Sequence, residues 1–383
     1  MESIYQTEEL ELFREQLRRF IEQEVEPFGE AWEETGTVPR EVLKKLGSLG
    51  FLGLAYPEKY GGAGLDMVAT AIFAEEMGRC TFGGFAATVL VHTDMGSPHL
   101  ANAGSDAQLK KYMPRITSGE SITAIAVTEP DAGSDVANLR TRAVRKGDVY
   151  VLDGTKMFIT NGIYGDLFFV AARTDPQAKG SRGISMFIVE KGTPGFKVGR
   201  PLKKQGWWCS DTAELIFEDC SVPAANLLGK ENEGFYAIMK NFQNERIVLG
   251  AMAIGACDKA LELTLDYVTT RRAFGGVLFD LQTIRQKLAE LASKVEAGRQ
   301  LVYHAAWMDA AGRDAVREVS MVKALCGELV NEVMYACQQF HGGAGYLRET
   351  PIERMVRDAR VLAIGGGATE VMLEEVAKRM VTN

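Results

Sequence analysis

The sequence changes character at the stretch Ala126-Val127-Thr128-Glu129-Pro130-Asp131-Ala132-Gly133-Ser134-Asp135. Turn-forming residues and hydroxyls here follow a short apolar run that predicts a strand. Backbone N–H groups in a glycine-containing turn can converge on a phosphorylated or flavin-like ligand, and the hydroxyls of Thr128 and Ser134 can donate to it. The same composition is typical of an ordinary strand-to-loop transition, which turn statistics favour for the stretch alone. It therefore indicates a ligand site only in company with other motifs.

Hydrophobic periodicity divides the chain into three parts around this stretch. Helical spacing runs from Glu8 to about Gly119, and long helical segments return from Glu233. Between them lie short apolar runs bounded by turn residues, which predict strands at 149–152, 167–172, 184–189 and 215–217. The later helical segments are 234–270, 282–312, 315–340, 352–362 and 369–380. We predict an α+β protein with an all-α N-terminal domain (1–122), a middle antiparallel β domain (123–230) and a C-terminal four-helix bundle (231–383).

Composition limits the class of protein. With 383 residues, 46% of them hydrophobic and 25% charged, the chain is typical of a globular protein with more than one core. The net charge of −8 argues against a nucleic-acid surface, which needs a basic stripe. The six cysteines and four histidines show no metal-ligand spacing, so we expect free thiols and no metal. No targeting leader and no apolar run of membrane-spanning length is evident, so we predict a cytoplasmic protein without a membrane span.

Three further motifs could complete a site. Lys156-Met157-Phe158-Ile159-Thr160-Asn161-Gly162 offers an aromatic ring for stacking and a hydroxyl donor, although a plain strand end with an Asn-Gly turn fits equally. Arg271-Arg272-Ala273-Phe274-Gly275 suits a pyrophosphate, and equally an exposed helix end followed by a turn. Gln339-Phe340-His341-Gly342-Gly343-Ala344-Gly345-Tyr346 allows close backbone approach to a ligand, but a Gly-rich turn alone is not specific.

The order and spacing of these four motifs, followed by Arg357-Asp358-Ala359-Arg360, resemble the acyl-CoA dehydrogenase family. The resemblance runs from about Glu8 to Met380. It implies a homotetramer, a dimer of dimers, in which each subunit has a helical domain, a β domain and a helical bundle. It also implies FAD as cofactor, an acyl-CoA substrate that is oxidised to a trans-2-enoyl-CoA in fatty acid β-oxidation, and electron-transfer flavoprotein as acceptor.

The resemblance also assigns residues to FAD. The flavin ring would be held by Ile125, Ala126, Val127, Thr128, Gly133, Ser134, Phe158, Ile159 and Thr160, with Ser134 also near the acyl-CoA. The pyrophosphate and adenosine would be held, partly from a neighbouring subunit, by Arg271, Phe274, Gln282, Gln339, Gly342 and Gly343. Glu370 is also assigned to FAD. The chain departs from the family pattern with Phe158 for a usual Trp, Asp131 for a usual Gly and Ala368 for a usual Thr.

The reaction of this family needs a carboxylate base, and the position that most members use holds no acid here. That position is Gly366, in Ile364-Gly365-Gly366-Gly367-Ala368. Long-chain and isovaleryl-type members instead carry a glutamate on a bundle helix, immediately before an arginine, and Gln243-Asn244-Glu245-Arg246-Ile247 matches that pattern. The resemblance therefore implies Glu245 as the base and a long-chain or branched substrate. It places Gln243, Asn244, Arg246 and Gly366 at the substrate, with the backbone N–H near Gly366 on the thioester oxygen.

Residue spacing independently predicts that Glu245 points inward. It shares one apolar helical face with Ile238, Phe242, Leu249 and Met252. An inward glutamate can also be a structural ion paired with an arginine. Two other interpretations stay open: an acyl-CoA oxidase that passes electrons to oxygen, and a non-catalytic flavin- or acyl-CoA-binding homologue that has lost the usual base.

Overall fold

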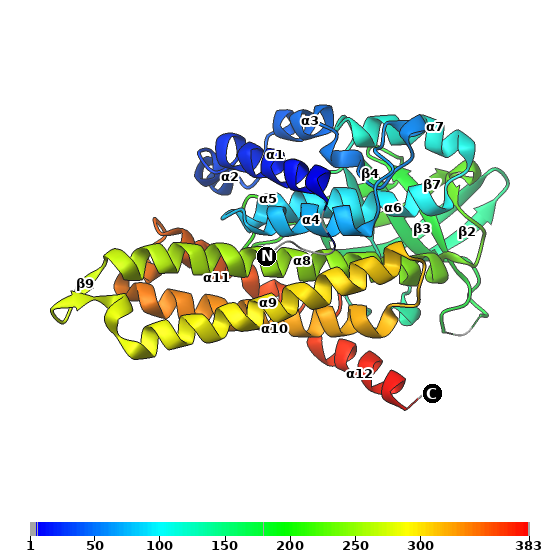
Figure 1. The fold of residues 1–383 in the computed structure, drawn as a ribbon. Helices are drawn as coiled ribbons and strands as arrows, with labels where there is room; N and C mark the ends of the chain where they lie inside the picture. Colours follow the sequence, from blue (N-terminus) through cyan, green and yellow to red (C-terminus); the bar gives the residue numbers. More distant parts are fainter. Residues whose placement is uncertain (1–4, 6, 179, 382–383) are drawn as a thin grey trace.

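A computed structural model describes Tyr5 and residues 7–178 and 180–381 of the chain. Seven α-helices and a π-helical turn come first (Figure 1). The helices are α1 (Glu8–Glu24), α2 (Gly29–Thr35), α3 (Arg40–Ser48), α4 (Met67–Gly78), α5 (Gly83–Leu90), α6 (Ser97–Ala103) and α7 (Asp106–Thr117), and the π-helical turn is η3 (Val91–Gly96). Short 3-10 turns, η1 (Phe51–Gly53) and η2 (Glu58–Tyr60), link α3 to α4.

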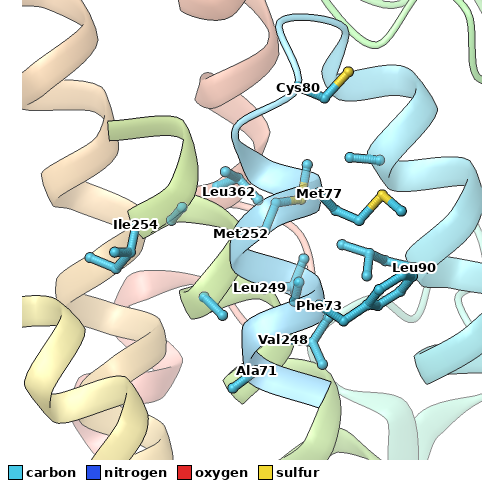
Figure 2. Packing of buried hydrophobic residues seen from close by; sticks show 14 of the residues in the cluster. Ala71, Phe73, Met77, Cys80, Leu90, Val248, Leu249, Met252, Ile254 and Leu362 are labelled. Carbon is cyan, nitrogen blue, oxygen red and sulfur yellow. The ribbon is translucent and has the colours of Figure 1, made fainter. Parts of the chain in front are cut away.

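Helix α4 joins the N-terminal helices to the bundle because it is apolar on nearly every side. Asp66 caps its start by accepting hydrogen bonds from the N–H groups of Val68 and Ala69. Figure 2 shows Phe73 and Met77 of α4 packed with Val248 and other apolar side chains of α8. At the crossing, glycines let the two backbones meet, since a Cβ on Gly255 would lie 1.8 Å from the carbonyl oxygen of Glu75.

The middle of the chain forms one sheet. Its strands are β1 (Thr123–Ala126), β2 (Arg142–Lys146), β3 (Val149–Thr160), β4 (Leu167–Arg173), β5 (Ile184–Glu190), β6 (Phe196–Pro201), β7 (Thr212–Pro223) and β8 (Leu227–Leu228). Their order is β6-β7-β3-β2-β4-β5-β8, and β1 pairs with β4. Two short 3-10 turns, η4 (Val136–Asn138) and η5 (Ala224–Asn226), lie in its connections.

The sheet differs from the prediction in the direction of some strand pairs, in the length of two strands, and in containing β2, β6 and β8, which the predicted runs do not include. Most pairs are antiparallel as predicted, but β1 runs parallel to β4, and β2 touches β4 through one parallel bridge, because the chain crosses over through β2 and β3 before it returns. Strands β3 and β7 are also much longer than the runs predicted at 149–152 and 215–217. Their apolar pattern breaks at two irregularities in the β3–β7 register, so the sequence pattern shows only part of each strand.

The last part of the chain is helical: α8 (Gly234–Thr270), α9 (Gln282–Ala310), α10 (Val316–His341), α11 (Pro351–Ala359) and α12 (Thr369–Met380). A small hairpin, β9 (Arg272–Ala273) and β10 (Gly276–Val277), and the 3-10 turn η6 (Leu278–Asp280) link α8 to α9. The turns η7 (Gly342–Tyr346) and η8 (Arg360–Ala363) flank α11. The predicted α+β architecture is therefore confirmed. Among the described helices, none combines the length and the apolar character that crossing a bilayer requires.

Candidate active site

Glu245 lies on α8 where the bundle meets the N-terminal helices and the sheet. Its side chain is 5% exposed, which confirms that it points inward. It forms no ion pair with a described residue; its Oε1 instead accepts a hydrogen bond of 2.9 Å from Nδ2 of Asn241. Burial raises the pKa of Glu245 to about 8, with Asn241 and Arg246 lowering it and Asp94 raising it. A buried carboxyl with so high a pKa is a strong base once ionised.

A second carboxyl, which is half-buried, belongs to this region. Asp94 lies in the π-helical turn η3, and burial raises its pKa to about 7, against the hydrogen bond that its carboxylate accepts from the Thr93 hydroxyl. Sequence analysis did not single out Asp94 or Asn241. Nothing in the local pattern marks them, because their position depends on how η3 packs against α8.

The Gly365–Gly367 loop lies against the same stretch of α8. Gly366 has a φ of +66°, and a Cβ placed on it would lie 2.2 Å from Cδ1 of Leu249, one helical turn beyond Glu245. A Cβ on Gly367 would lie 3.5 Å from Nε of Arg246. The usual base position and Glu245 therefore border one site, and an acid at Gly366 would be both strained and obstructed.

A buried lysine forms hydrogen bonds with the backbone around this loop. Lys323 on α10 is 1% exposed, and its Nζ donates to the carbonyl oxygens of Leu362 (2.7 Å) and Gly367 (2.8 Å). Burial, with Arg246 adding to the effect, lowers the pKa of Lys323 to about 8. These two bonds fix the backbone on both sides of Gly366.

Three of the remaining substrate candidates lie next to Glu245 on α8, and the fourth, Ser134, lies on the loop after β1. Gln243 Oε1 and Arg246 Nε are buried and have no hydrogen-bond partner among the described residues. Buried polar atoms without partners are costly in a folded protein, so such atoms beside a base favour a polar ligand. Asn244 is half-buried, and Ser134 is exposed on the loop after β1.

The two predicted flavin-ring segments meet at the end of β3. The Met157 N–H donates to the Thr128 carbonyl (2.9 Å), and Nζ of Lys156 donates to the Val127 carbonyl (3.0 Å) and to Oε1 of Glu129 (2.7 Å). Lys156 and Glu129 are both buried. Although burial alone would raise it, Lys156 and backbone N–H groups lower the pKa of Glu129 overall. This internal ion pair locks the loop after β1 onto β3.

Phe158 stands out from the sheet beside this junction. The β3–β7 register shifts between Lys156 and Ile159, and Phe158 takes a φ of +61° that leaves its side chain 66% exposed. A bulky residue with positive φ is strained, and such strain is concentrated at functional sites. The geometry suits an aromatic ring that stacks on a flat ligand, with Thr128, Gly133 and Thr160 accessible nearby. Ala126, Val127 and Ile159 are buried and Ile125 is half-buried, so the buried three can reach a ligand only through backbone groups.

The predicted pyrophosphate and adenosine residues lie at the far end of the bundle (Figure 1). Arg271 follows Glu245 by 26 residues along α8, which corresponds to about 40 Å. The two ends of α8 and α10 meet there, since the rings of Tyr267 and His341 stack 4.5 Å apart. Phe274 at the hairpin tip is 90% exposed. Also exposed are Arg271, Gln282, Gln339, Gly342 and Gly343.

One chain therefore does not bring the two groups of predicted FAD residues together. Gly342 and Gly343 meet no atom within 4 Å of an added Cβ, so this end of the bundle is open to a ligand or a second chain. Glu370 lies apart from both groups, exposed in the first turn of α12. The residues fit FAD as two separate half-sites. One is the surface around Phe158 at the end of β3, which suits the flavin ring, and the other is the exposed end of the bundle with Arg271 and the glycines Gly342 and Gly343.

Comparisons with known proteins agree with this architecture. Three family profiles match in order: acyl-CoA dehydrogenase N-terminal domain (7–120), middle domain (124–220) and C-terminal domain (232–381). The chain belongs to the acyl-CoA dehydrogenase family, a class of flavin-dependent oxidoreductases, and it is an acyl-CoA dehydrogenase with FAD as its cofactor.

Individual relatives span nearly the whole chain. It is 43% identical to the long-chain specific acyl-CoA dehydrogenase, mitochondrial, of Rattus norvegicus (98% of this chain, 87% of the relative) and 38% identical to the isovaleryl-CoA dehydrogenase, mitochondrial, of Pongo abelii (95% and 87%). The crystal structure of acyl-CoA dehydrogenase from Geobacillus kaustophilus matches with a TM-score of 0.96 at 42% identity, covering 100% of both chains. A structure described as the FAD complex of PigA matches with a TM-score of 0.95 at 28% identity, covering 99% of both.

Proposed function

We propose that Glu245 is the catalytic base of this dehydrogenase and that its substrate is a long-chain or branched acyl-CoA. The observation that carries this proposal is a contrast between two positions. Gly366 has no acid and a φ of +66° that disfavours one, whereas Glu245, on the stretch of α8 against which the Gly365–Gly367 loop lies, is a buried carboxyl. Its pKa of about 8 suits removal of a proton from carbon. Arg246 and the backbone fixed by Lys323 complete the surroundings.

In the proposed reaction, the ionised carboxylate of Glu245 removes the α-proton of the thioester. FAD, when bound, supplies the acceptor for the β-hydrogen, which leaves as hydride, so that the product is a trans-2-enoyl-CoA. Charge that develops on the thioester oxygen needs fixed donors, and the backbone N–H near Gly366 is the candidate. That contact needs no side chain, so glycine serves it.

Two features support a long-chain or branched substrate. A base on α8 leaves the Gly365–Gly367 loop free of a side chain, which gives room near the reacting carbons. Relatives whose names include long-chain and isovaleryl types are 43% and 38% identical to this chain. We also infer a dimer of dimers, in which the exposed end of one bundle completes the FAD site of a neighbour, and electron-transfer flavoprotein as the acceptor.

The test is anaerobic titration of the FAD-loaded protein with acyl-CoAs of short, long and branched chains, followed by loss of flavin absorbance. We expect bleaching with long or branched chains, and a decrease of at least about 10³-fold in its rate in Glu245→Gln with FAD still bound. Glu262→Gln, a surface carboxylate on the same helix that pairs with Lys259, is the matched control and keeps the parental rate.

Each alternative gives a different result in this experiment. Binding of acyl-CoA without bleaching across the whole panel would favour a non-catalytic homologue. Rapid oxygen uptake during turnover, with no stimulation by electron-transfer flavoprotein, would favour an oxidase. A fully active Glu245→Gln protein would disprove the assignment of the base.

A further inference from the structure

Asn241 connects the candidate base to the π-helical turn η3. It lies one turn before Glu245 on α8 and is 1% exposed. Its Nδ2 lies 2.9 Å from Oε1 of Glu245, 3.3 Å from the carbonyl oxygen of Asp94 and 3.2 Å from that of Met95. A single amide group therefore bridges the base and two consecutive carbonyls of η3.

The π turn brings two of its carbonyls to the Asn241 amide. A π-helical turn inserts an extra residue into the helical hydrogen-bond pattern and so disturbs the pairing of its backbone groups, and such turns are frequent at functional sites. Buried carbonyls without a donor are unfavourable, and the Asn241 amide supplies one. The hydroxyl of Tyr56 donates in the same way to the carbonyl of Thr93.

The same contacts fix the orientation of the Asn241 amide. The Asp94 and Met95 carbonyls can only accept, so the face of Asn241 toward them must be the NH₂ group and not the oxygen. Of its two hydrogens, one serves the two carbonyls and the other points at Glu245. Glu245 therefore faces a donor in either protonation state.

We propose that Asn241 is a positioning residue for the base: it holds Oε1 of Glu245 as a permanent hydrogen-bond acceptor and leaves Oε2 to receive the substrate proton. This inference rests on the proposed role of Glu245. The carbonyls of η3 hold the Asn241 amide in place. The orientation of the Glu245 carboxylate therefore depends on the N-terminal helical region as well as on α8. A merely structural Asn241 would support η3 without affecting the chemistry of Glu245.

The electrostatic consequence can be tested. A hydrogen bond to a carboxylate favours its charged form. The other charged groups that act on Glu245 are Arg246 from α8, which favours ionisation, and Asp94 from η3, which opposes it. Loss of the Asn241 donor leaves the balance to burial and to these two groups, so the base ionises at higher pH.

The experiment compares Asn241→Ala and the nearly isosteric Asn241→Asp with the parent, all loaded with FAD. The probe is an acyl-CoA with sulfur in place of the β-carbon, which can lose an α-proton but cannot give up a hydride. Mass spectrometry follows its α-deuteration in D₂O between pH 6 and 10. Asn331→Ala is the control, because Asn331 donates similarly to the Gly327 carbonyl on α10, away from the site.

We expect the pH midpoint of exchange to rise by about one unit or more in both Asn241 variants, since one pKa unit corresponds to a lost interaction of ordinary hydrogen-bond strength. At pH 7 exchange would be at least about tenfold slower, and it would recover largely in Asn241→Ala at high pH. Asn331→Ala would keep the parental midpoint. Unchanged midpoints in both Asn241 variants would overturn the inference even if Glu245→Gln abolishes exchange. Parental exchange in Glu245→Gln would instead overturn the base assignment.

Discussion

The middle and the end of α8 are built in opposite ways. Around Glu245 the helix is enclosed by η3, the Gly365–Gly367 loop and α4, and polar groups there are buried. At Arg271 the helix ends, and an exposed hairpin follows. The side chain of Phe274 at its tip is almost fully exposed to solvent. One chain thus encloses the proposed base, whereas the residues proposed for the cofactor's pyrophosphate end lie on an open surface.

This contrast separates the proposed base, which a single subunit encloses, from the proposed cofactor contacts, which a single subunit leaves open. Proton abstraction depends on desolvation, which the fold of one chain provides at Glu245. In the proposed assignment, cofactor retention needs both the residues at β3 and those at the exposed end of the bundle, which one chain does not bring together. Substitutions in the middle of α8 should therefore alter chemistry and stability, whereas those at its end should alter binding alone.

The largest effect is expected when the base is moved to the position that most of the family uses. Glu245→Gly combined with Gly366→Glu should reduce flavin at least about 10³-fold more slowly, because the new side chain meets Leu249 and a positive φ. Adding Leu249→Ala to this double variant should raise its rate of flavin reduction at least about tenfold. Anaerobic stopped-flow absorbance measures the rate. Parental activity in the double variant would show that Gly366 has room for an acid.

The buried ion pair between Lys156 and Glu129, next to Phe158, should give the next largest effect when it is broken. Lys156→Met leaves the buried carboxylate of Glu129 unpaired and should lower the free energy of unfolding by roughly 4 kcal/mol. Lys197→Met removes an exposed pair with Glu218 on the same sheet and should cost less than about 1 kcal/mol. Urea denaturation measures both, and equal losses would contradict the structural role of the buried pair.

These examples also show what the sequence could and could not predict. Periodicity predicts the bounds of α8 and α12, and it predicts that Glu245 points inward. Each of these features depends on residue spacing along one helix. The pairing of Glu129 with Lys156 depends on the register of β1, β3 and their loops, which no local pattern encodes. The contact of Asn241 with η3 depends likewise on tertiary packing. The assigned domain boundaries and ligand roles stay predictions.

The free energy of unfolding should depend on pH through Glu245, and the direction should be opposite to that of most carboxylates, whose pKa is lowered by folding. Its folded pKa of about 8 lies above the ordinary value of 4.5, so the folded state binds a proton that the unfolded state has lost, and stability falls as pH rises between these values. Glu245→Gln removes this effect. We expect it to be more stable than the parent at pH 9 by several kcal/mol, at about 1.4 kcal/mol for each unit of the pKa difference, and nearly equal at pH 4. Urea unfolding at both pH values tests this, and a less stable variant at pH 9 would mean that the ionised carboxylate has a partner.

The smallest effect is expected at the far end of the helix, where exposure changes what a substitution can do. Arg271→Ala removes an exposed guanidinium, so the free energy of unfolding without cofactor should change by less than about 0.5 kcal/mol. Loss of a charge-assisted contact to a pyrophosphate should still weaken FAD binding about tenfold or more, measured by flavin fluorescence. Arg313→Ala, whose guanidinium lies over Trp307 at the other end of α9, is the control and should leave FAD affinity unchanged. Unaltered FAD affinity in Arg271→Ala would remove this end of α8 from the cofactor site, whereas weaker binding at unchanged stability would show that the open end binds the ligand without supporting the fold.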